Sequence, residues 1–175
     1  MINQMYTLKN HYNIDEQTTV KAIIELYDDK LMLEYQILGN LSHYHFPKQT
    51  KQERANELWL DTTFELFIAP TNSDEYWEIN IAPSTQWNVY HFTSYKEGMK
   101  ESNIISQPTI KTYEYHNEYR LTFNATVAHE HFNQALQINL CTILLDQNGV
   151  RHFYSIKRCE GDVDFHDRAY FVVLN

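Results

Sequence analysis

The stretch ELWLDTTFELFIAP, residues 57–70, alternates large apolar residues with polar ones and ends at a proline. Successive side chains of a β-strand point to opposite faces of the sheet. A strand over residues 63–69 therefore has one uniformly apolar face, which belongs in a core and consists of Phe64, Leu66 and Ile68. Its other face is mixed, because Glu65 and Phe67 share it with a threonine. The alternation predicts a β-strand with two chemically different faces.

A second strand is expected over residues 75–82, after a turn at residues 70–74 that holds proline, asparagine and aspartate. Trp77 lies in phase with Ile79 and Ile81, which predicts that its indole belongs to the core. The opposite, mixed set consists of Tyr76, Glu78 and Asn80. If the two strands pair, their mixed sets form one polar and aromatic sheet face. The pattern alone favours a solvated face over one that holds a polar ligand.

Similar alternation recurs along the chain and is typical of an antiparallel β protein. About ten strands are expected, over residues 19–27, 31–38, 63–69, 75–82, 86–92, 109–115, 119–127, 136–145, 151–156 and 169–174. Helix is expected only in two short pieces, residues 93–99 and 128–135. Two packed sheets bury many half-apolar strands well, so the prediction is an all-β, antiparallel β-sandwich of jelly-roll type. The polar segment 39–58 is long for a compact domain and is expected to be a functional or a mobile loop.

The length and composition predict one folded domain over residues 1–175. The sequence has no internal repeat and no flexible linker. Its net charge is −9, with acids and bases interspersed, which argues against nucleic acid or an anionic membrane as the main partner. The N-terminal residues are polar from the third onward, and no apolar run is long enough to span a membrane. We therefore expect a cytoplasmic protein. The sequence does not indicate an oligomeric state.

Cysteines and histidines are the candidate metal ligands of the sequence. Cys141 and Cys159 lack the spacing of a zinc site and are expected to be reduced thiols. Histidines two residues apart occur at residues 43 and 45 and at residues 129 and 131. Neither pair has a third potential ligand at a sequence spacing typical of metal sites, so solvated histidines are the favoured interpretation. No metal and no cofactor is predicted; His152 is one of several residues that could ligate haem, but nothing in the pattern marks it.

Two longer motifs resemble a known family. WLDTTFELFIAP, residues 59–70, followed by EYWEINIAPSTQWNVYHF, residues 75–92, resembles the DOMON-like domains related to family 9 carbohydrate-binding modules. The tail DFHDRAYFVVL, residues 164–174, is similar to the closing strand region of the bacterial branch of that family. The resemblance spans most of the chain. It implies a β-sandwich whose concave sheet binds a sugar or, in other branches, a haem.

In the sugar-binding members, the sugar ring lies between two tryptophans. The resemblance places Trp59 on the first of these, Glu65 on an acid that accepts hydrogen bonds from hydroxyls, and Asn80 on an amide of the neighbouring strand. Glu78 stands where those members carry an arginine, and no tryptophan follows Trp87, which parity assigns to the core. The second wall would then come from Phe165, His166 or Tyr154.

A pyranose presents an apolar face of C–H groups and a rim of hydroxyls, which suits a flat aromatic surface beside a few oriented polar groups. Trp59 is either such a platform or a packing residue at the sheet edge. The leading hypothesis is non-catalytic binding of a carbohydrate or sugar-like small molecule. A glycoside-acting enzyme that uses Glu65 and Glu78 is one alternative. A protein-interaction module with exposed aromatic residues is the other.

Overall fold

The computed structural model describes residues 1–12, 17–128, 132 and 134–174. In these residues the chain forms twelve strands and three short 3-10 helices, so the all-β prediction is confirmed. The elements are β1 (Ile2–Asn10), β2 (Thr19–Tyr27), β3 (Lys30–Leu38), η1 (Leu41–His43), η2 (Leu58–Leu60), β4 (Thr63–Pro70), β5 (Tyr76–Ile81), β6 (Trp87–Phe92), β7 (Lys100–Glu101), β8 (Thr109–Tyr115), β9 (Glu118–Thr126), β10 (Leu136–Leu145), β11 (Arg151–Ser155), η3 (Arg168–Tyr170) and β12 (Val172–Val173).

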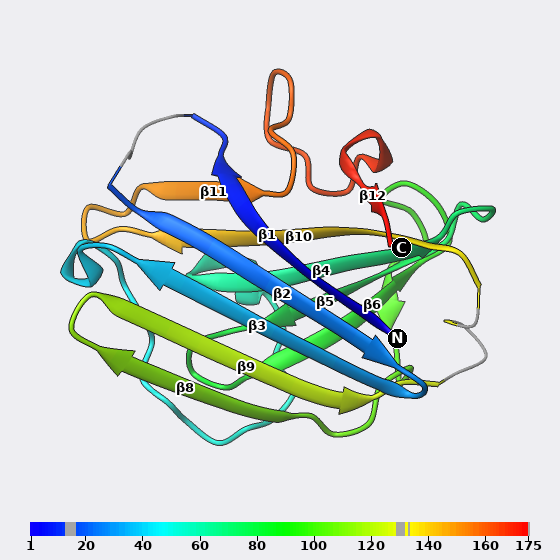
Figure 1. The fold of residues 1–175 in the computed structure, drawn as a ribbon, viewed down its shortest axis with the longest axis horizontal. Coiled ribbons are helices and arrows are strands. Elements are labelled where there is room, and N and C mark those ends of the chain that lie inside the picture. Colours follow the sequence, from blue (N-terminus) through cyan, green and yellow to red (C-terminus); the bar gives the residue numbers. More distant parts are fainter. Residues whose placement is uncertain (13–16, 129–131, 133, 175) are drawn as a thin grey trace.

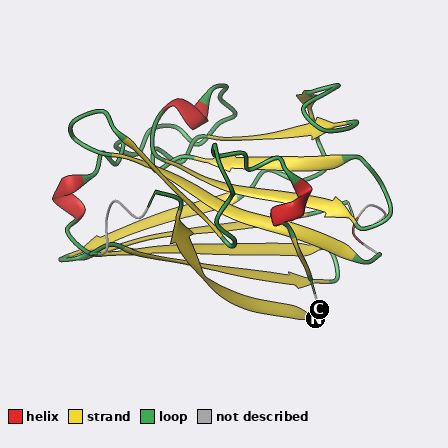
Figure 2. Cartoon of the chain, turned by 90° about the horizontal axis from the view of Figure 1, so that it is seen from above, coloured by secondary structure: helices red, strands yellow, loops and turns green. Residues whose placement is uncertain are grey.

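The strands form one curled sheet in the order β7-β6-β5-β4-β10-β11-β1-β2-β3-β9-β8, with β12 added beside β10. The named strands pair antiparallel, as expected. Figure 1 shows β1, β2, β3, β9 and β8 as one layer in front of β11, β10, β4, β5 and β6, and Figure 2 shows the same molecule from above. The layers are joined where the end of β1 meets β11, at Lys9↔Ser155 and Asn10↔Tyr154. The finer prediction of a jelly-roll sandwich is not confirmed.

The main core lies between the two layers. The apolar face of β4 contributes Phe64, Leu66 and Ile68, all essentially inaccessible to solvent. Phe64 stacks against Tyr119 of β9 with ring centroids 6.1 Å apart, which ties the two layers together. Trp77 and Trp87 also lie in this core, as their parity predicts. Burying a large apolar side chain is worth about 1.5–3 kcal/mol, so this face of β4 is a major source of stability.

The strand count was too low because β1 and β7 were missed. On β1 the half-buried and exposed residues do alternate, but the inward set includes the polar Gln4 and the outward set the apolar Met5. This inversion at Gln4 and Met5 interrupts the alternation of apolar and polar residues by which a strand is recognised in a sequence. β7 is only two residues long and has no pattern of its own. The closing strand is also shorter than predicted, because η3 occupies residues 168–170.

Helix formation at residues 93–99 was a wrong prediction. This segment forms turns, and Lys96 and Gly98 have φ angles of 57° and 67°. Residues in the left-handed region cannot continue a right-handed helix. A side chain at Gly98 would also place its Cβ 2.3 Å from Thr93 Oγ1, so glycine is required there. Half of the other predicted helix, residues 128–135, lies outside the described residues, and so do His129 and His131.

The segment 39–58 is fastened to the sheet by hydrogen bonds and bridges. Tyr44 bridges to Asp146, and Arg54 bridges to Trp87, over whose ring the guanidinium stacks at 4.4 Å. Arg54 also donates a 2.7 Å hydrogen bond to the side chain of Asn88. The segment leads directly into η2, so these anchors fix the position of Trp59.

Both cysteines are free and buried, in agreement with the expected reduced thiols. No helix within the described residues is long and apolar enough to cross a membrane.

Candidate functional site

The mixed sets of β4 and β5 do form one sheet face. In the register of these strands, Glu65 lies opposite Asn80 and Phe67 opposite Glu78. Glu65 and Glu78 are therefore diagonal neighbours on the same face, a relation that places Cα atoms roughly 7–8 Å apart. The two strands pair, so the predicted shared face of their mixed sets is confirmed. The favoured interpretation of a solvated face is wrong, because Glu65, Glu78 and Asn80 are 2%, 5% and 0% exposed.

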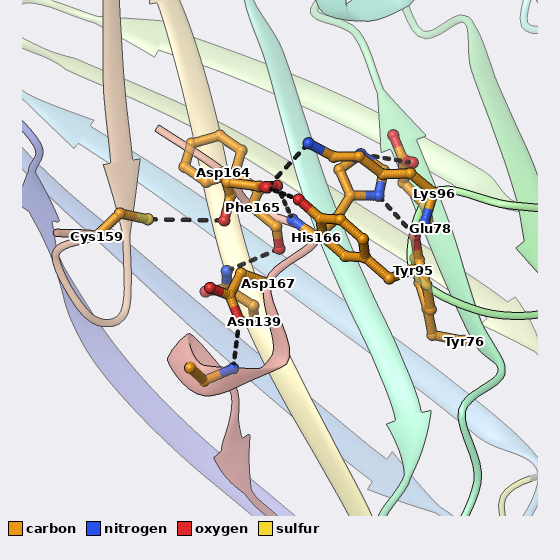
Figure 3. A network of polar contacts seen from close by, with 11 residues as sticks. Tyr76, Glu78, Tyr95, Lys96, Asn139, Cys159, Asp164, Phe165, His166 and Asp167 are labelled. Carbon is orange, nitrogen blue, oxygen red and sulfur yellow. Dashed lines mark hydrogen bonds and ion pairs between the residues drawn. The ribbon is translucent and has the colours of Figure 1, made fainter. Parts of the chain in front are cut away.

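The C-terminal segment covers much of this face. Phe165 and Phe171 pack with Phe67 in a second apolar cluster, separate from the main core, and Trp59 packs against the same cluster. Figure 3 shows Asp164, Phe165, His166 and Asp167 beside Asn139 of β10, and Tyr76 and Glu78 of β5 lie on the other side of His166. Asn139 Nδ2 donates to the backbone oxygen of Phe165 at 3.3 Å, which anchors the covering segment.

Between the sheet face and its cover lies a cavity of about 400 Å³. Its walls are mainly aromatic and aliphatic, with carboxylates and one histidine among them: Trp59, Glu65, Phe67, Glu78, Phe92, Lys96, Met99, Ile143, Phe153, Val163, Asp164, Phe165 and His166. Five of the six residues predicted to bind ligand are in this lining. The sixth, Asn80, is not in the lining and donates a 2.8 Å hydrogen bond to Glu78 Oε1. Tyr154, offered as a possible wall, lies in the main core instead.

Trp59 stands at the cavity wall on the short helix η2. Glu57, which precedes this helix, has φ 59°, a left-handed conformation that turns the chain into η2. The indole is only partly buried and contacts Tyr90 edge to face, with ring centroids 5.9 Å apart. The Tyr90 hydroxyl in turn donates a 2.7 Å hydrogen bond to Asn56 Oδ1. Trp59 is thus positioned by a hydrogen-bonded neighbour and still borders the cavity.

The two glutamates of the sheet face favour their neutral forms. Burial raises the pKa of Glu65 well above its ordinary value, and the negative charge of Glu78 raises it further. Burial raises the pKa of Glu78 to about 7, although the hydrogen bond from Asn80 opposes this shift. A protonated carboxyl can donate a hydrogen bond as well as accept one. Near neutral pH, Glu65 therefore offers both functions to the cavity, whereas the sequence suggested an ionised acceptor.

His166 is neutral and has a defined orientation. The Tyr76 hydroxyl accepts from the backbone N–H of Lys96 at 3.1 Å and lies 2.8 Å from His166 Nδ1. We assign the hydroxyl as the donor to Nδ1, which places the proton of the neutral imidazole on Nε2, 3.9 Å from Glu78 Oε2. Burial lowers the pKa of His166 to about 4, although the charge of Asp164 opposes this shift. Its ring packs on Phe67 and Phe92, at 5.0 and 5.2 Å.

A charged rim borders the cavity beside His166. Lys96 Nζ lies 2.9 Å from Asp164 Oδ2, and the Tyr95 hydroxyl donates to the same oxygen (Figure 3). The other oxygen, Asp164 Oδ1, accepts from the backbone N–H of His166 at 3.1 Å. Although burial opposes it, these hydrogen bonds lower the pKa of Asp164. Sequence reasoning missed Lys96 because it lies in the segment interpreted as helix, and the only signal for Asp164 was its place beside Phe165.

The histidines at residues 43 and 45 do not converge on a shared position. His45 Nδ1 pairs with Asp61 Oδ1 at 2.9 Å. His43 instead approaches Asp146 and His152, neither of which was linked to it from the sequence. The sequence could not link the three residues because His43 is distant along the chain from Asp146 and His152.

Comparisons with known proteins identify a shared fold. No protein-family model and no curated protein matches the sequence. A crystal structure of a Bacteroides uniformis protein, proposed to bind carbohydrate, is 14% identical with a TM-score of 0.72, over 98% of this chain and 84% of that one. A family 9 carbohydrate-binding module from Caldicellulosiruptor kristjanssonii, in complex with cellotriose, is 13% identical with a TM-score of 0.51, over 95% of this chain and 76% of that one. At these identities the likeness is one of fold.

Proposed function

We propose that this chain binds a carbohydrate or sugar-like ligand, without catalysis, in the cavity over β4 and β5. One observation carries the proposal: residues from distant parts of the chain line a single cavity that combines aromatic walls with buried hydrogen-bonding groups. They are Trp59, Glu65, Glu78, Phe165 and His166. A volume of about 400 Å³ lies within the range of small-molecule sites.

The aromatic walls suit the apolar face of a sugar ring. Trp59 provides the largest flat surface at the wall, and Phe153 and Phe165 provide further aromatic surface. C–H groups of a pyranose pack well on such surfaces, because both are apolar and removing water from them costs little free energy. Trp59 is the proposed stacking wall, and Phe165 with His166 is the proposed opposing side, in place of the second tryptophan of the sugar-binding family that the sequence resembles.

The polar groups suit uncharged hydroxyls better than ionised ligands. A hydroxyl both donates and accepts, and a cavity lined by a protonated Glu65 and a neutral His166 offers donors as well as acceptors. An anionic ligand would be repelled by either carboxyl, Glu65 or Glu78, whenever that carboxyl is ionised. A cationic ligand would be paired only after these carboxyls had lost their protons. Asn80 acts through Glu78 in this arrangement, because its amide holds Glu78 Oε1 in place.

The structural neighbours support the same assignment. Of the two proteins that share the fold, one is proposed to bind carbohydrate and the other was solved with cellotriose. An oligosaccharide is therefore a reasonable first ligand to try, and the DOMON-like resemblance of residues 59–92 is consistent with it.

The test is a titration of mono- and oligosaccharides, cellotriose included, monitored by tryptophan fluorescence and by calorimetry. At least one sugar should produce a saturable signal. Loss of a central aromatic contact commonly costs about 2 kcal/mol, so Trp59→Ala should weaken binding about 30-fold. Tyr115→Ala is the matched control, because this tyrosine is 73% exposed on β8 and does not line the cavity. No response to any sugar, or equal affinity in Trp59→Ala, would refute the proposal.

A second candidate function is glycoside hydrolysis by Glu65 and Glu78. The specific observation in its favour is that two carboxyls with raised pKa values share one cavity, as the acid and base of a glycosidase do. A panel of chromogenic glycosides tests it. Turnover by the wild type that is lost in both Glu65→Gln and Glu78→Gln would establish an enzyme, whereas sugar binding without turnover supports a binding module.

A further inference from the structure

Three potential metal ligands meet at the turn between β10 and β11, away from the proposed sugar cavity. Asp146 Oδ2 lies 3.3 Å from His152 Nε2 and 3.8 Å from His43 Nε2. One ligand atom from each of the three residues can be chosen so that all lie within 4.8 Å of one another. Asp146 and His152 are buried, whereas the side chain of His43 is 44% exposed.

The backbone holds these residues together independently of their side chains. Tyr44, next to His43, forms a β-bridge with Asp146. The amide of Gln147 donates to the carbonyl of His43 at 3.0 Å, and the amide of His45 donates to the carbonyl of Leu145 at 2.7 Å. The segment after η1 is therefore paired to the β10–β11 turn. This pairing places His43 beside Asp146, at the start of the turn, and His152, on β11.

The two oxygens of Asp146 have different roles. Oδ1 accepts from the backbone N–H groups of Asn148 and Val150, both at 2.8 Å, which fixes the carboxylate within the turn. Oδ2 is left to face the two histidines. On His152, the buried Nδ1 has no hydrogen-bond partner among the described residues. Among the described residues, the polar contact of this buried ring is therefore made by Nε2, which lies beside Asp146 Oδ2.

We propose that His43, Asp146 and His152 bind a divalent transition metal of the zinc class. Zinc bonds of about 2.0–2.1 Å in tetrahedral geometry place ligand atoms about 3.4 Å apart, close to the separations from Asp146 Oδ2. Imidazole nitrogen with one carboxylate suits zinc, cobalt or iron(II), whereas calcium and magnesium prefer oxygen ligands throughout. Three protein ligands leave a coordination position for water or a ligand group.

The three residues line a second cavity, of about 360 Å³, together with Thr18 and Asn40. It is separate from the sugar cavity: His152 and Phe153 are consecutive on β11 and point to opposite faces, and only Phe153 borders the sugar cavity. Metal binding and sugar binding are therefore expected to be independent.

Metal-stripped wild-type protein would be titrated with Zn²⁺ by calorimetry and with Co²⁺ by visible absorption, with Ca²⁺ and Mg²⁺ as comparison ions. The expected result is one tight Zn²⁺ equivalent, a Co²⁺ spectrum typical of nitrogen and oxygen ligands, and no competition by millimolar Ca²⁺ or Mg²⁺. A cluster that is only a metal-free ion pair would give no such equivalent, which would overturn the proposal.

His43→Ala is the decisive variant, because its partly exposed position tolerates substitution. Loss of even an outer-shell partner weakens metal binding about 10- to 100-fold, so loss of His43 should weaken it at least that much. His45→Ala is the matched control, since His45 is two residues away, pairs with Asp61 and is not a ligand. Asp146→Asn should behave like His43→Ala. Equal Zn²⁺ affinity in wild type and His43→Ala, or an equal loss in His45→Ala, would contradict the assignment.

Discussion

The two faces of β4 and β5 are equally buried but chemically opposite. On the core face, Phe64 and Ile79 belong to the hydrophobic cluster between the layers. On the cavity face, Glu65 and Glu78 are almost as inaccessible, yet they carry carboxyls whose pKa values are raised by the burial. The comparison teaches that burial alone does not distinguish core from site. What distinguishes them is the presence of ionisable groups kept buried at a cost, which is a mark of functional sites.

The tryptophans differ in the same way. Trp77 and Trp87 are 4% and 2% exposed and belong to the main core, whereas Trp59 stands partly exposed at the cavity wall. Removing a core ring should therefore affect stability, and removing the wall ring should affect binding. The predictions that follow test this division, beginning with the largest effect.

Replacing Phe64 by alanine should lower the free energy of unfolding by about 3–5 kcal/mol, because it leaves a void between the two layers. Phe153→Ala, at the wall of the cavity, should cost only about 1 kcal/mol, since that ring already borders open space. Urea denaturation followed by circular dichroism measures both. Equal losses would show that the two faces do not differ in packing as described.

The cavity face should make stability depend on pH in two opposing ways. The folded-state pKa of Glu78 is raised to about 7, so the folded protein binds an extra proton below that pH and loses stability as pH rises from about 4.5 to 7. The folded-state pKa of His166 is lowered to about 4, so the unfolded chain binds the extra proton and stability is lost as pH falls from about 6.5 to 4. A shift of this size corresponds to about 3 kcal/mol for each group.

Single variants separate the two contributions. Relative to wild type, Glu78→Gln should gain stability progressively between pH 4.5 and 7, because the cost of ionising the buried carboxyl is removed. His166→Gln should gain stability as pH falls from 6.5 to 4, since no imidazole has to stay neutral. Denaturation curves across this range provide the measurement. Variants whose difference from wild type does not change with pH would contradict the assigned protonation states.

Tyr76→Phe should lower the free energy of unfolding by about 1–2 kcal/mol, because it removes the two hydrogen bonds of this hydroxyl, with His166 and with the backbone N–H of Lys96. Its more informative consequence concerns His166, whose Nδ1 would lose the donor that keeps it unprotonated. Nitrogen NMR of the imidazole should show the Nε2–H tautomer in wild type and a mixture in the variant. A wild-type ring protonated on Nδ1 would show that His166 donates to the Tyr76 hydroxyl, the reverse of the assigned direction.

Parity along single strands was enough to predict much of the sheet. The two faces of β4 and the core positions of Trp77 and Trp87 follow from alternation, whereas the register that sets Glu65 opposite Asn80 does not. The same rule could not find β1, because Gln4 points inward and Met5 outward. Rules of local pattern describe which face a residue takes, but they do not describe what lies over that face.

The site was only partly predictable for the same reason. The motif of residues 59–92 contains Trp59, Glu65 and Glu78. Burial of the two carboxyls depends instead on a C-terminal segment that is distant in sequence. That cover buries the acids of the face that was expected to be solvated, and burial raises their pKa values. The charged rim of Lys96 and Asp164 likewise depends on long-range packing, which no single segment encodes.

The most direct test of the proposed cavity uses the three indole N–H signals of the protein, which report on Trp59, Trp77 and Trp87 separately. Titration with the sugar panel should shift the Trp59 signal saturably and leave the two core indoles nearly unchanged. Sugars that bind while Trp59 stays unshifted, or a panel that shifts none of the three, would contradict the claim that this cavity is a carbohydrate site.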